Sequence, residues 1–195
     1  MSYLGLFLYP FTLLVTILHE MGHALGALLT GGAVVSLKVA PDGSGLCTTA
    51  GGLAFVVIPV GYLGSVVFGN LMLYLGIKRP KLARSALFAF ALALIGISFV
   101  WFGGITSLAI TLGWGLVFLL IAYKLPKVSR LFFILAGVYS VVYVLRDYSG
   151  GPSSDLAVFA SLTHLPATLW TYVWLGLAVL ITFCNVFFFL RGKQK

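Results

Sequence analysis

Three ionisable side chains, His19, Glu20 and His23, lie inside an apolar run of the sequence, LLVTILHEMGHALGALL. Histidines four positions apart project from one face of an α-helix, because four residues make about one turn. Two imidazoles at this spacing can bind one Zn²⁺ ion. Glu20 lies about 100° around the helix from His19, so its carboxylate can reach a zinc-bound water without binding the metal itself.

The pattern His-Glu-x-x-His is typical of zinc hydrolases. Zinc lowers the pKa of a bound water towards about 7, and the glutamate can take the proton and later return it to a leaving amine. The alternative is a hydrogen-bonded cluster of these side chains that only holds helices together. An ionisable group inside a bilayer costs about 2.5 kcal/mol or more, which favours a functional site with one Zn²⁺ per chain.

A third zinc ligand must come from elsewhere in the chain, because a catalytic zinc usually has three protein ligands and a water. The remaining candidates are Asp42, Asp147, Asp155 and His164. Asp42 is in a Pro-Asp-Gly-Ser-Gly turn, where aspartate is an ordinary turn residue, and Asp147 can pair with the preceding arginine. We favour Asp155 as a metal ligand, because a carboxylate halves the charge of an ion held by two neutral imidazoles. Helix N-capping by Asp155, with His164 as the ligand, is the alternative.

The composition indicates a polytopic membrane protein. The chain is 61% hydrophobic and 8% charged, whereas a soluble domain has roughly 25% charged residues. We predict an all-α membrane fold of about six transmembrane helices, forming a single domain over residues 1–195. The net charge of +8 is no indication of nucleic-acid binding, because the basic residues form short clusters between apolar runs, where they meet lipid headgroups.

The apolar runs predict where the chain crosses the membrane, since a helix needs about 20 residues to span it. The segment after the first run contains two short strand-like stretches, Val34–Val39 and Leu46–Ala50, around the Pro-Asp-Gly-Ser-Gly turn, and it predicts a β-hairpin. Residues 156–165 are apolar but too few to span. We predict spans at about residues 4–29, 53–77, 85–102, 105–123, 131–145 (a short one) and 167–190.

The basic residues predict the orientation. With six spans, ten of the twelve Lys and Arg residues fall on the side that holds both termini, and only Lys38 and Arg146 fall on the other. Such a bias places the basic side, and both termini, in the cytoplasm. We expect a multi-pass protein of the plasma membrane of a prokaryote. His19 and His23 then lie in the half of their span nearer the non-cytoplasmic face.

Four segments together resemble the site-2 protease family of intramembrane zinc metalloproteases: HEMGHALGALLTGG, the hairpin, GYLGSVVFGN and SSDLA. The closest resemblance is to the compact branch without a PDZ domain. The resemblance implies that His19, His23 and Asp155 bind zinc and that Glu20 is the catalytic base. Two motifs differ from the family pattern: Asp155 is in a Ser-Asp-Leu-Ala context instead of Leu-Asp-Gly, and Gly61–Ser65 replaces Gly-Pro-x-x-Asn.

The hairpin suggests how a substrate is held. A helical membrane segment must unwind locally before cleavage, and its freed backbone groups then need partners in lipid. The edge of either hairpin strand could supply them by strand addition. We therefore expect an intramembrane zinc endopeptidase acting on a locally unwound transmembrane segment of a membrane protein in the lipid bilayer. The alternative is a non-proteolytic binder or chaperone of membrane segments. A transporter is disfavoured, because the second to fourth spans contain no acid and no histidine.

Overall fold

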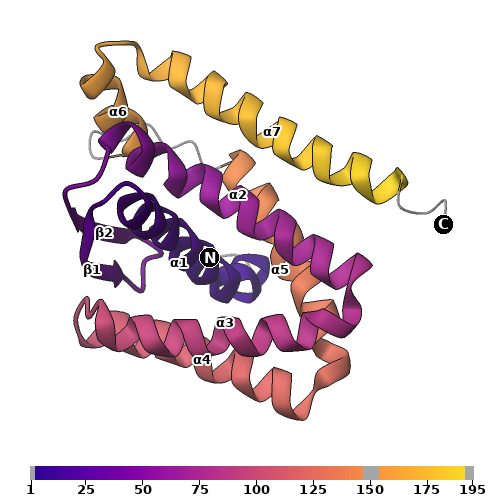
Figure 1. The fold of residues 1–195 in the computed structure, drawn as a ribbon. Helices are drawn as coiled ribbons and strands as arrows, with labels where there is room; N and C mark the ends of the chain where they lie inside the picture. The colour runs from indigo at the N-terminus through magenta and orange to yellow at the C-terminus, as the bar shows by residue number, and fades with distance from the viewer. Residues whose placement is uncertain (1–2, 147–153, 192–195) are drawn as a thin grey trace.

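The structure, a computed structural model, describes residues 3–146 and 154–191. Within these ranges the chain forms helices and one two-stranded antiparallel hairpin that follows the first helix (Figure 1). The predicted all-α membrane fold with a hairpin after its first helix is therefore confirmed. The elements are α1 (Tyr3–Leu29), β1 (Ala33–Val39), β2 (Gly45–Ala50), α2 (Ala54–Lys78), α3 (Pro80–Val100), α4 (Ile105–Lys124), α5 (Pro126–Arg146), α6 (Asp155–Thr163) and α7 (Ala167–Arg191).

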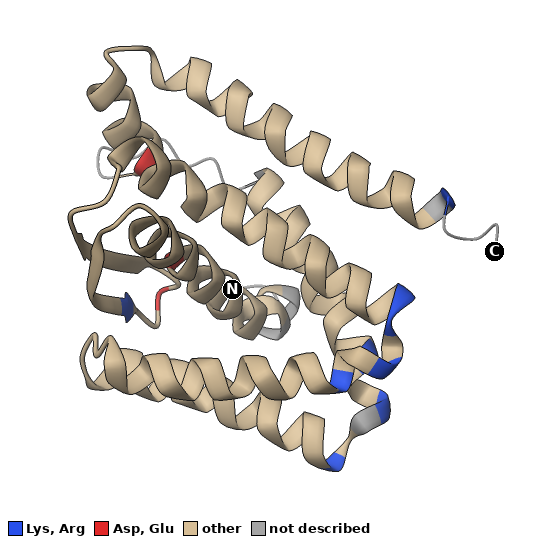
Figure 2. Ribbon diagram, in the orientation of Figure 1, with Lys and Arg blue, Asp and Glu red and all other residues tan. Residues whose placement is uncertain are grey.

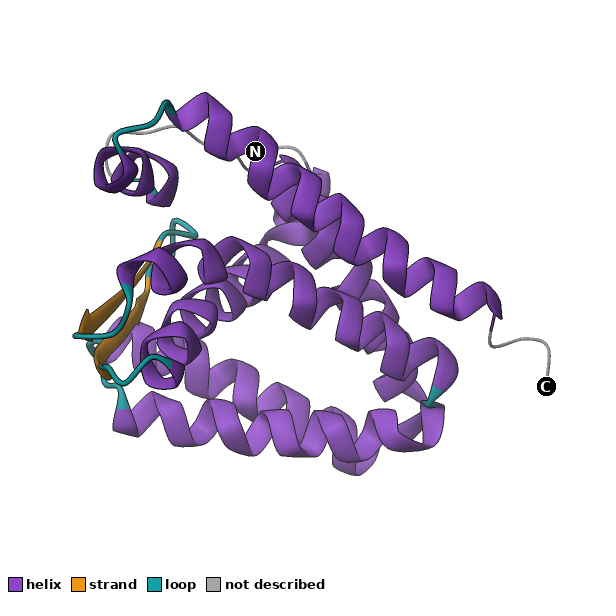
Figure 3. Cartoon of the chain, turned by 45° about the horizontal axis from the view of Figure 1, so that its top comes forward, coloured by secondary structure: helices purple, strands orange, loops and turns teal. Residues whose placement is uncertain are grey.

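Six of the described helices, α1 to α5 and α7, are long and apolar enough to cross a membrane. The nine-residue helix α6 is too short to do so. The hairpin and α6 lie at one end of the bundle, and the α2–α3 and α4–α5 connections lie at the other (Figure 1). The same division is visible in the turned view, where the hairpin occupies one edge of an otherwise helical molecule (Figure 3). The chain is thus a multi-pass membrane protein.

Two helices begin earlier than the apolar pattern predicts. Pro80 is at the start of α3 and Pro126 is the first residue of α5. Proline is favoured in the first helical turn, because the N–H that it lacks would have no partner within the helix. The basic segments 78–84 and 124–130, which fall between the predicted spans, are therefore mostly helical. The expectation of a short fifth span was wrong, since α5 has 21 residues.

Two of these basic side chains hold the ends of neighbouring helices. The Arg84 Nε–H donates to the carbonyl of Ala122 at 2.8 Å, and the Arg130 Nε–H donates to the carbonyl of Gly76 at 3.1 Å. The last carbonyls of a helix have no partner within that helix. A cation at this end also interacts favourably with the helix dipole. The arginines therefore stabilise the C-terminal ends of α4 and α2.

Charges of opposite sign gather at opposite ends of the described part of the molecule (Figure 2). Lys and Arg residues cluster at the end away from the hairpin, and the exceptions are Lys38 in β1 and Arg146, the last residue of α5. The described acidic residues, Glu20, Asp42 and Asp155, lie at the hairpin end. The helices place the histidines of α1 at this acidic end as well.

Glycines allow α1 and α2 to pack closely. A Cβ atom on Gly22 would lie 2.3 Å from the carbonyl oxygen of Val60, and a Cβ on Gly64 would lie 3.1 Å from the Cα of Gly22. Small residues at such contacts let the backbones of membrane helices approach each other. This close approach brings the middle of α2 against the histidine face of α1.

The hairpin is closed along one of its two outer edges. In β1 the Leu37 N–H donates to the carbonyl of Trp101 at 3.0 Å, and the Val39 N–H donates to Ser107 Oγ at 3.1 Å. The Ser107 hydroxyl in turn donates to the carbonyl of Leu37 at 3.0 Å. The end of α3 and the start of α4 thus occupy the edge of β1. Leu37 is paired with Cys47 across the hairpin. Because the backbone groups of Leu37 point away from β2, those of Cys47 point away from β1, to the other edge of the hairpin, towards α1.

Candidate metal centre

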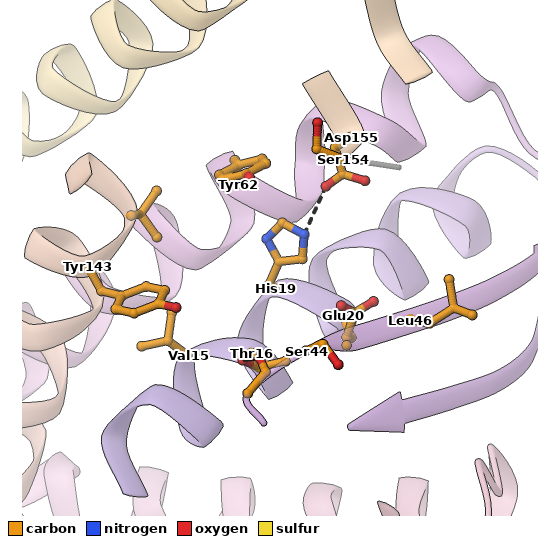
Figure 4. Close-up of a pocket in the computed structure, with 13 residues that line it drawn as sticks. Val15, Thr16, His19, Glu20, Ser44, Leu46, Tyr62, Tyr143, Ser154 and Asp155 are labelled. Carbon is orange, nitrogen blue, oxygen red and sulfur yellow. Dashed lines mark hydrogen bonds and ion pairs between the residues drawn. The ribbon is translucent and has the colours of Figure 1, made fainter. Parts of the chain in front are cut away.

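Three side chains from two distant helices converge at the hairpin end of the bundle. His19 and His23 project from one face of α1, and Asp155 is the first residue of α6. Figure 4 shows the His19 ring and the Asp155 carboxylate directed towards each other. The Asp155 Oδ2 atom lies 2.9 Å from His19 Nε2 and 3.1 Å from His23 Nε2, and the two Nε2 atoms are 3.1 Å apart. One ligand atom from each residue lies within 4.8 Å of the others.

This arrangement fits a zinc ion. Bonds of about 2.0–2.1 Å in tetrahedral geometry separate neighbouring ligand atoms by about 3.3 Å, close to the three distances between Asp155 Oδ2 and the histidine nitrogens. Two imidazoles and one carboxylate are also ligand types that zinc takes in catalytic sites. The residues present can therefore hold the metal that the His-Glu-x-x-His pattern predicts.

A backbone contact orients His23. Its Nδ1 lies 2.7 Å from the carbonyl oxygen of Val57 in α2. A carbonyl only accepts, so Nδ1 carries the proton, and in the neutral ring Nε2 presents a lone pair. That lone pair points towards Asp155 Oδ2 and His19 Nε2, so the three atoms can bind one cation together. Such a partner behind a ligating histidine is usual in metal sites, and the sequence contains no side-chain signal for Val57.

The glycine at position 61 leaves the space that the histidines occupy. A Cβ atom there would lie 2.4 Å from His23 Nε2 and 2.8 Å from His19 Nε2. The adjacent Tyr62 packs its ring edge-on against His19, with 4.8 Å between the ring centroids. The Gly61-Tyr62 pair therefore forms the α2 wall of the centre, although the family pattern has proline in the place of the tyrosine.

We predict that Gly61→Ala lowers zinc occupancy severalfold, because the added methyl group displaces both imidazoles. Zinc per chain, measured by plasma mass spectrometry on purified protein, tests this. Gly96→Ala is the matched control, since a Cβ at this exposed helical glycine would meet no atom within 4 Å. Equal zinc content in the two variants would contradict the tight placement of Gly61.

Glu20 lies beside the three converging residues and is not one of them. Its side chain is buried, and a Cβ atom on Gly45 would lie 2.2 Å from Glu20 Oε1. The backbone N–H of Cys47 in β2 donates to the same carboxylate. Glu20 is thus held between α1 and the outer edge of β2. The Cys47 thiol is no candidate nucleophile, because burial and the neighbouring Glu20 raise its pKa to about 12.

Helix N-capping does not occupy the Asp155 carboxylate. Ser154 is the N-cap of α6, and its hydroxyl accepts a hydrogen bond from the Ala157 N–H at 3.3 Å. Burial opposes ionisation of Asp155, but the neighbouring His19 and His23 outweigh burial and hold the pKa of the carboxyl below its usual range.

The other acids and the third histidine lie apart from this cluster in the described part of the chain. His164 is the exposed C-cap of α6, in the left-handed conformation with φ 57°. Asp42 accepts hydrogen bonds from the N–H and the hydroxyl of Ser44, at 2.9 and 2.6 Å, as a turn residue does. Asp147 lies outside the described residues.

A cavity of about 370 Å³ opens beside the centre. His19, Glu20 and Asp155 line it together with the start of β2, and residues of α2 and α5 form its far side (Figure 4). The cavity thus exposes the carboxylate of Glu20 together with His19 and Asp155.

The fold and this centre define a multi-pass membrane protein with a candidate metal site at the hairpin end of its helices. The chain belongs to the Peptidase M50B-like family, whose sequence model matches residues 3–185. This assignment confirms the resemblance to the site-2 protease family and indicates an intramembrane metallopeptidase. No curated protein and no solved structure matches the chain.

Proposed function

We propose that the chain is an intramembrane zinc endopeptidase, with residues 1–195 forming one membrane-embedded domain. One Zn²⁺ ion is held by His19, His23 and Asp155, and Glu20 is the general base. The proposal depends on one observation. Three ligand atoms lie within 4.8 Å of one another, and the separate, buried carboxylate of Glu20 lies beside them and lines the adjacent cavity. A pure binder or chaperone of membrane segments has no need for such a base.

The residues divide the chemistry between them. Bound zinc would supply Lewis acidity that activates a water molecule and polarises the scissile carbonyl. Glu20 accepts the proton of the attacking water and returns it to the nitrogen of the leaving amine. The backbone N–H of Cys47 and the close contact with Gly45 hold the Glu20 carboxylate in one position. The Val57 carbonyl keeps His23 in the tautomer that presents Nε2 to the centre.

The function is tested by incubating the purified, zinc-loaded protein in detergent with a peptide that contains an apolar span. Cleavage that depends on zinc, detected by mass spectrometry of the products, supports the endopeptidase. Binding of the peptide without any cleavage would instead support the non-proteolytic binder.

The outer edge of β2 is the better of the two edges for holding an unwound substrate, although at Cys47 its N–H already donates to Glu20. The edge of β1 is already occupied by Trp101 and Ser107. Along β2, Cys47 faces outward, and with a period of two Gly45 and Thr49 do the same. The start of this edge lines the cavity next to Glu20. A substrate strand paired with β2 would therefore pass the general base.

We predict that Thr49→Pro lowers kcat/KM for a membrane-segment substrate by about 2- to 10-fold, since one backbone hydrogen bond contributes about 0.5–1.5 kcal/mol. Proline removes an outward donor without breaking the β1–β2 ladder. Thr49→Ala, which keeps the N–H, is the control and should cleave like the wild type. Zinc content should stay the same in both variants. Equal kcat/KM values for the two would remove the support for strand addition at β2.

We also propose that the end with the basic residues is cytoplasmic, in a prokaryotic plasma membrane, with both termini on that side. The separation of charges along the bundle supports this orientation (Figure 2). The candidate metal centre then lies nearer the non-cytoplasmic face.

For this orientation we predict that a reporter active only outside the cytoplasm is active when it is fused after Gly103 and inactive when it is fused after Arg191. Gly103 lies in the α3–α4 connection, at the hairpin end of the bundle. The reciprocal pattern with a cytoplasmic reporter is the control. Cytoplasmic activity at Gly103 would reverse the orientation.

A further inference from the structure

The cavity beside the centre extends along α1 beyond the residues that we assign to the metal and the general base. It continues for one helical turn, from His19 and Glu20 to Val15 and Thr16, which lie four residues earlier on the same face. Its volume of about 370 Å³ is roughly ten times the 30 Å³ or so that one water molecule occupies. The cavity therefore has room for a substrate side chain as well as the attacking water.

Helix α5 supplies the opposite wall of this extension. Tyr143 and Val144 line the cavity, and Figure 4 shows the Tyr143 ring directed from α5 towards Val15 and Thr16. Val15 and Val144 are 3% and 2% exposed and belong to one packed cluster of buried side chains. These two walls are therefore fixed in place by the core of the protein.

The charged groups among the described lining residues are confined to the reactive centre. They are His19, Glu20 and Asp155, and the other described lining residues are uncharged. The Thr16 hydroxyl is engaged, because it donates to the carbonyl of Gly43 at 2.7 Å. A charged substrate side chain in the extension would find no group of opposite charge among the four residues of its two walls and would lose hydration, at a high cost in free energy.

We propose that Val15, Thr16, Tyr143 and Val144 form a specificity pocket for the side chain of a residue that flanks the scissile bond. The pocket takes a bulky uncharged side chain, such as Leu, Met, Phe or Tyr, and excludes Asp, Glu, Lys and Arg. A small side chain binds less well, since it leaves part of the pocket unfilled. This inference rests on the proposed peptidase function and names the substrate class of that site.

The test is a library of apolar peptides in detergent micelles, in which Ala, Val, Leu, Phe, Asp and Lys each occur at every position. The zinc-loaded wild-type protein is incubated with the library, and mass spectrometry of the products gives the residues on both sides of each cleaved bond. We expect one flanking position to be enriched in Leu and Phe and depleted in Asp and Lys. Cleavage with the same frequency of all six residues at every flanking position would overturn the pocket.

A matched pair of variants connects the preference to the pocket. Val144→Ala enlarges the pocket. We therefore expect the preference for a Phe-bearing over a Val-bearing peptide, measured as the ratio of their kcat/KM values, to rise about tenfold. This factor is the lower end of what one methylene group changes in an apolar pocket. Val141→Ala removes the same atoms from another buried position of α5, one that does not line the cavity, and should leave the ratio unchanged. Val15→Ala, on the other wall, replaces Val144→Ala if that variant does not fold.

A second measurement does not depend on cleavage. Binding of the Phe- and Val-bearing peptides to Glu20→Gln should show the same preference, and Val144→Ala in this background should strengthen it. An unchanged preference in Val144→Ala and in Val15→Ala would overturn the pocket while leaving the peptidase intact. Absence of any zinc-dependent cleavage by the wild-type protein, with selective binding retained, would instead remove the proposed function.

Discussion

Replacing Glu20 by glutamine should lower the rate constant of peptide hydrolysis by about 10²- to 10⁴-fold, the usual contribution of a positioned general base. Glutamine keeps the shape of the side chain and can still accept a hydrogen bond from the Cys47 N–H, but its amide cannot take a proton from water. Because Glu20 is separate from the three converging ligand atoms, zinc content should stay at one per chain. Single-turnover cleavage of an apolar peptide, with zinc measured on the same sample, provides both values.

The control for Glu20→Gln is Asp42→Asn, which makes the same change from acid to amide at the hairpin turn. Asp42 is exposed and bonded to Ser44, so this variant should cleave like the wild type. A Glu20→Gln variant that cleaves at the wild-type rate would disprove the proposed mechanism. Loss of zinc in Glu20→Gln would mean that the glutamate is itself a ligand.

Replacing Asp155 by alanine should lower zinc affinity by more than about 100-fold, beyond the 10- to 100-fold typical of losing only a hydrogen-bonding partner of a ligand. The carboxylate lies 2.9 and 3.1 Å from the two imidazole nitrogens. Its removal leaves two histidines, too few for a catalytic zinc site. Zinc affinity measured by competition with a chelator tests the expectation, and peptide cleavage should disappear together with the metal.

His164→Ala is the matched control, because His164 was the competing candidate for the third ligand. It lies at the far end of the nine-residue helix α6 and is exposed. Its replacement should leave zinc affinity and cleavage at the wild-type values. The opposite result, with zinc lost in His164→Ala and kept in Asp155→Ala, would exchange the two assignments.

The sequence was sufficient to predict features with a local cause. Membrane helices follow from the length of apolar runs, and the common face of His19 and His23 follows from helical spacing. The preference for Asp155 over His164 agrees with the geometry, although its role as a ligand stays a prediction. The start of α5 was missed because Lys127 and Arg130 interrupt the apolar pattern, while Pro126 in the first helical turn allows the helix to begin before them.

Features that depend on contacts between distant segments could not be predicted. The carbonyl of Val57 has no side-chain signature, so its bond to His23 appears only when α1 and α2 are packed together. The hydroxyl of Ser107 closes the edge of β1 from 68 residues away. The sequence therefore left both hairpin strands open to a substrate, and only their surroundings in the fold favour β2.

The distance in sequence between the parts of the metal centre has a consequence for biosynthesis. Asp155 follows His19 by 136 residues, and the chain is made from its N-terminus. During translation α1, with both histidines and the glutamate, leaves the ribosome long before α6 is made. A nascent or truncated chain that ends before Asp155 contains the two histidines and the glutamate but no third ligand. The proposed peptidase would therefore be inactive while it is being made, and newly inserted neighbours in the membrane would be safe from it until its own synthesis is nearly complete.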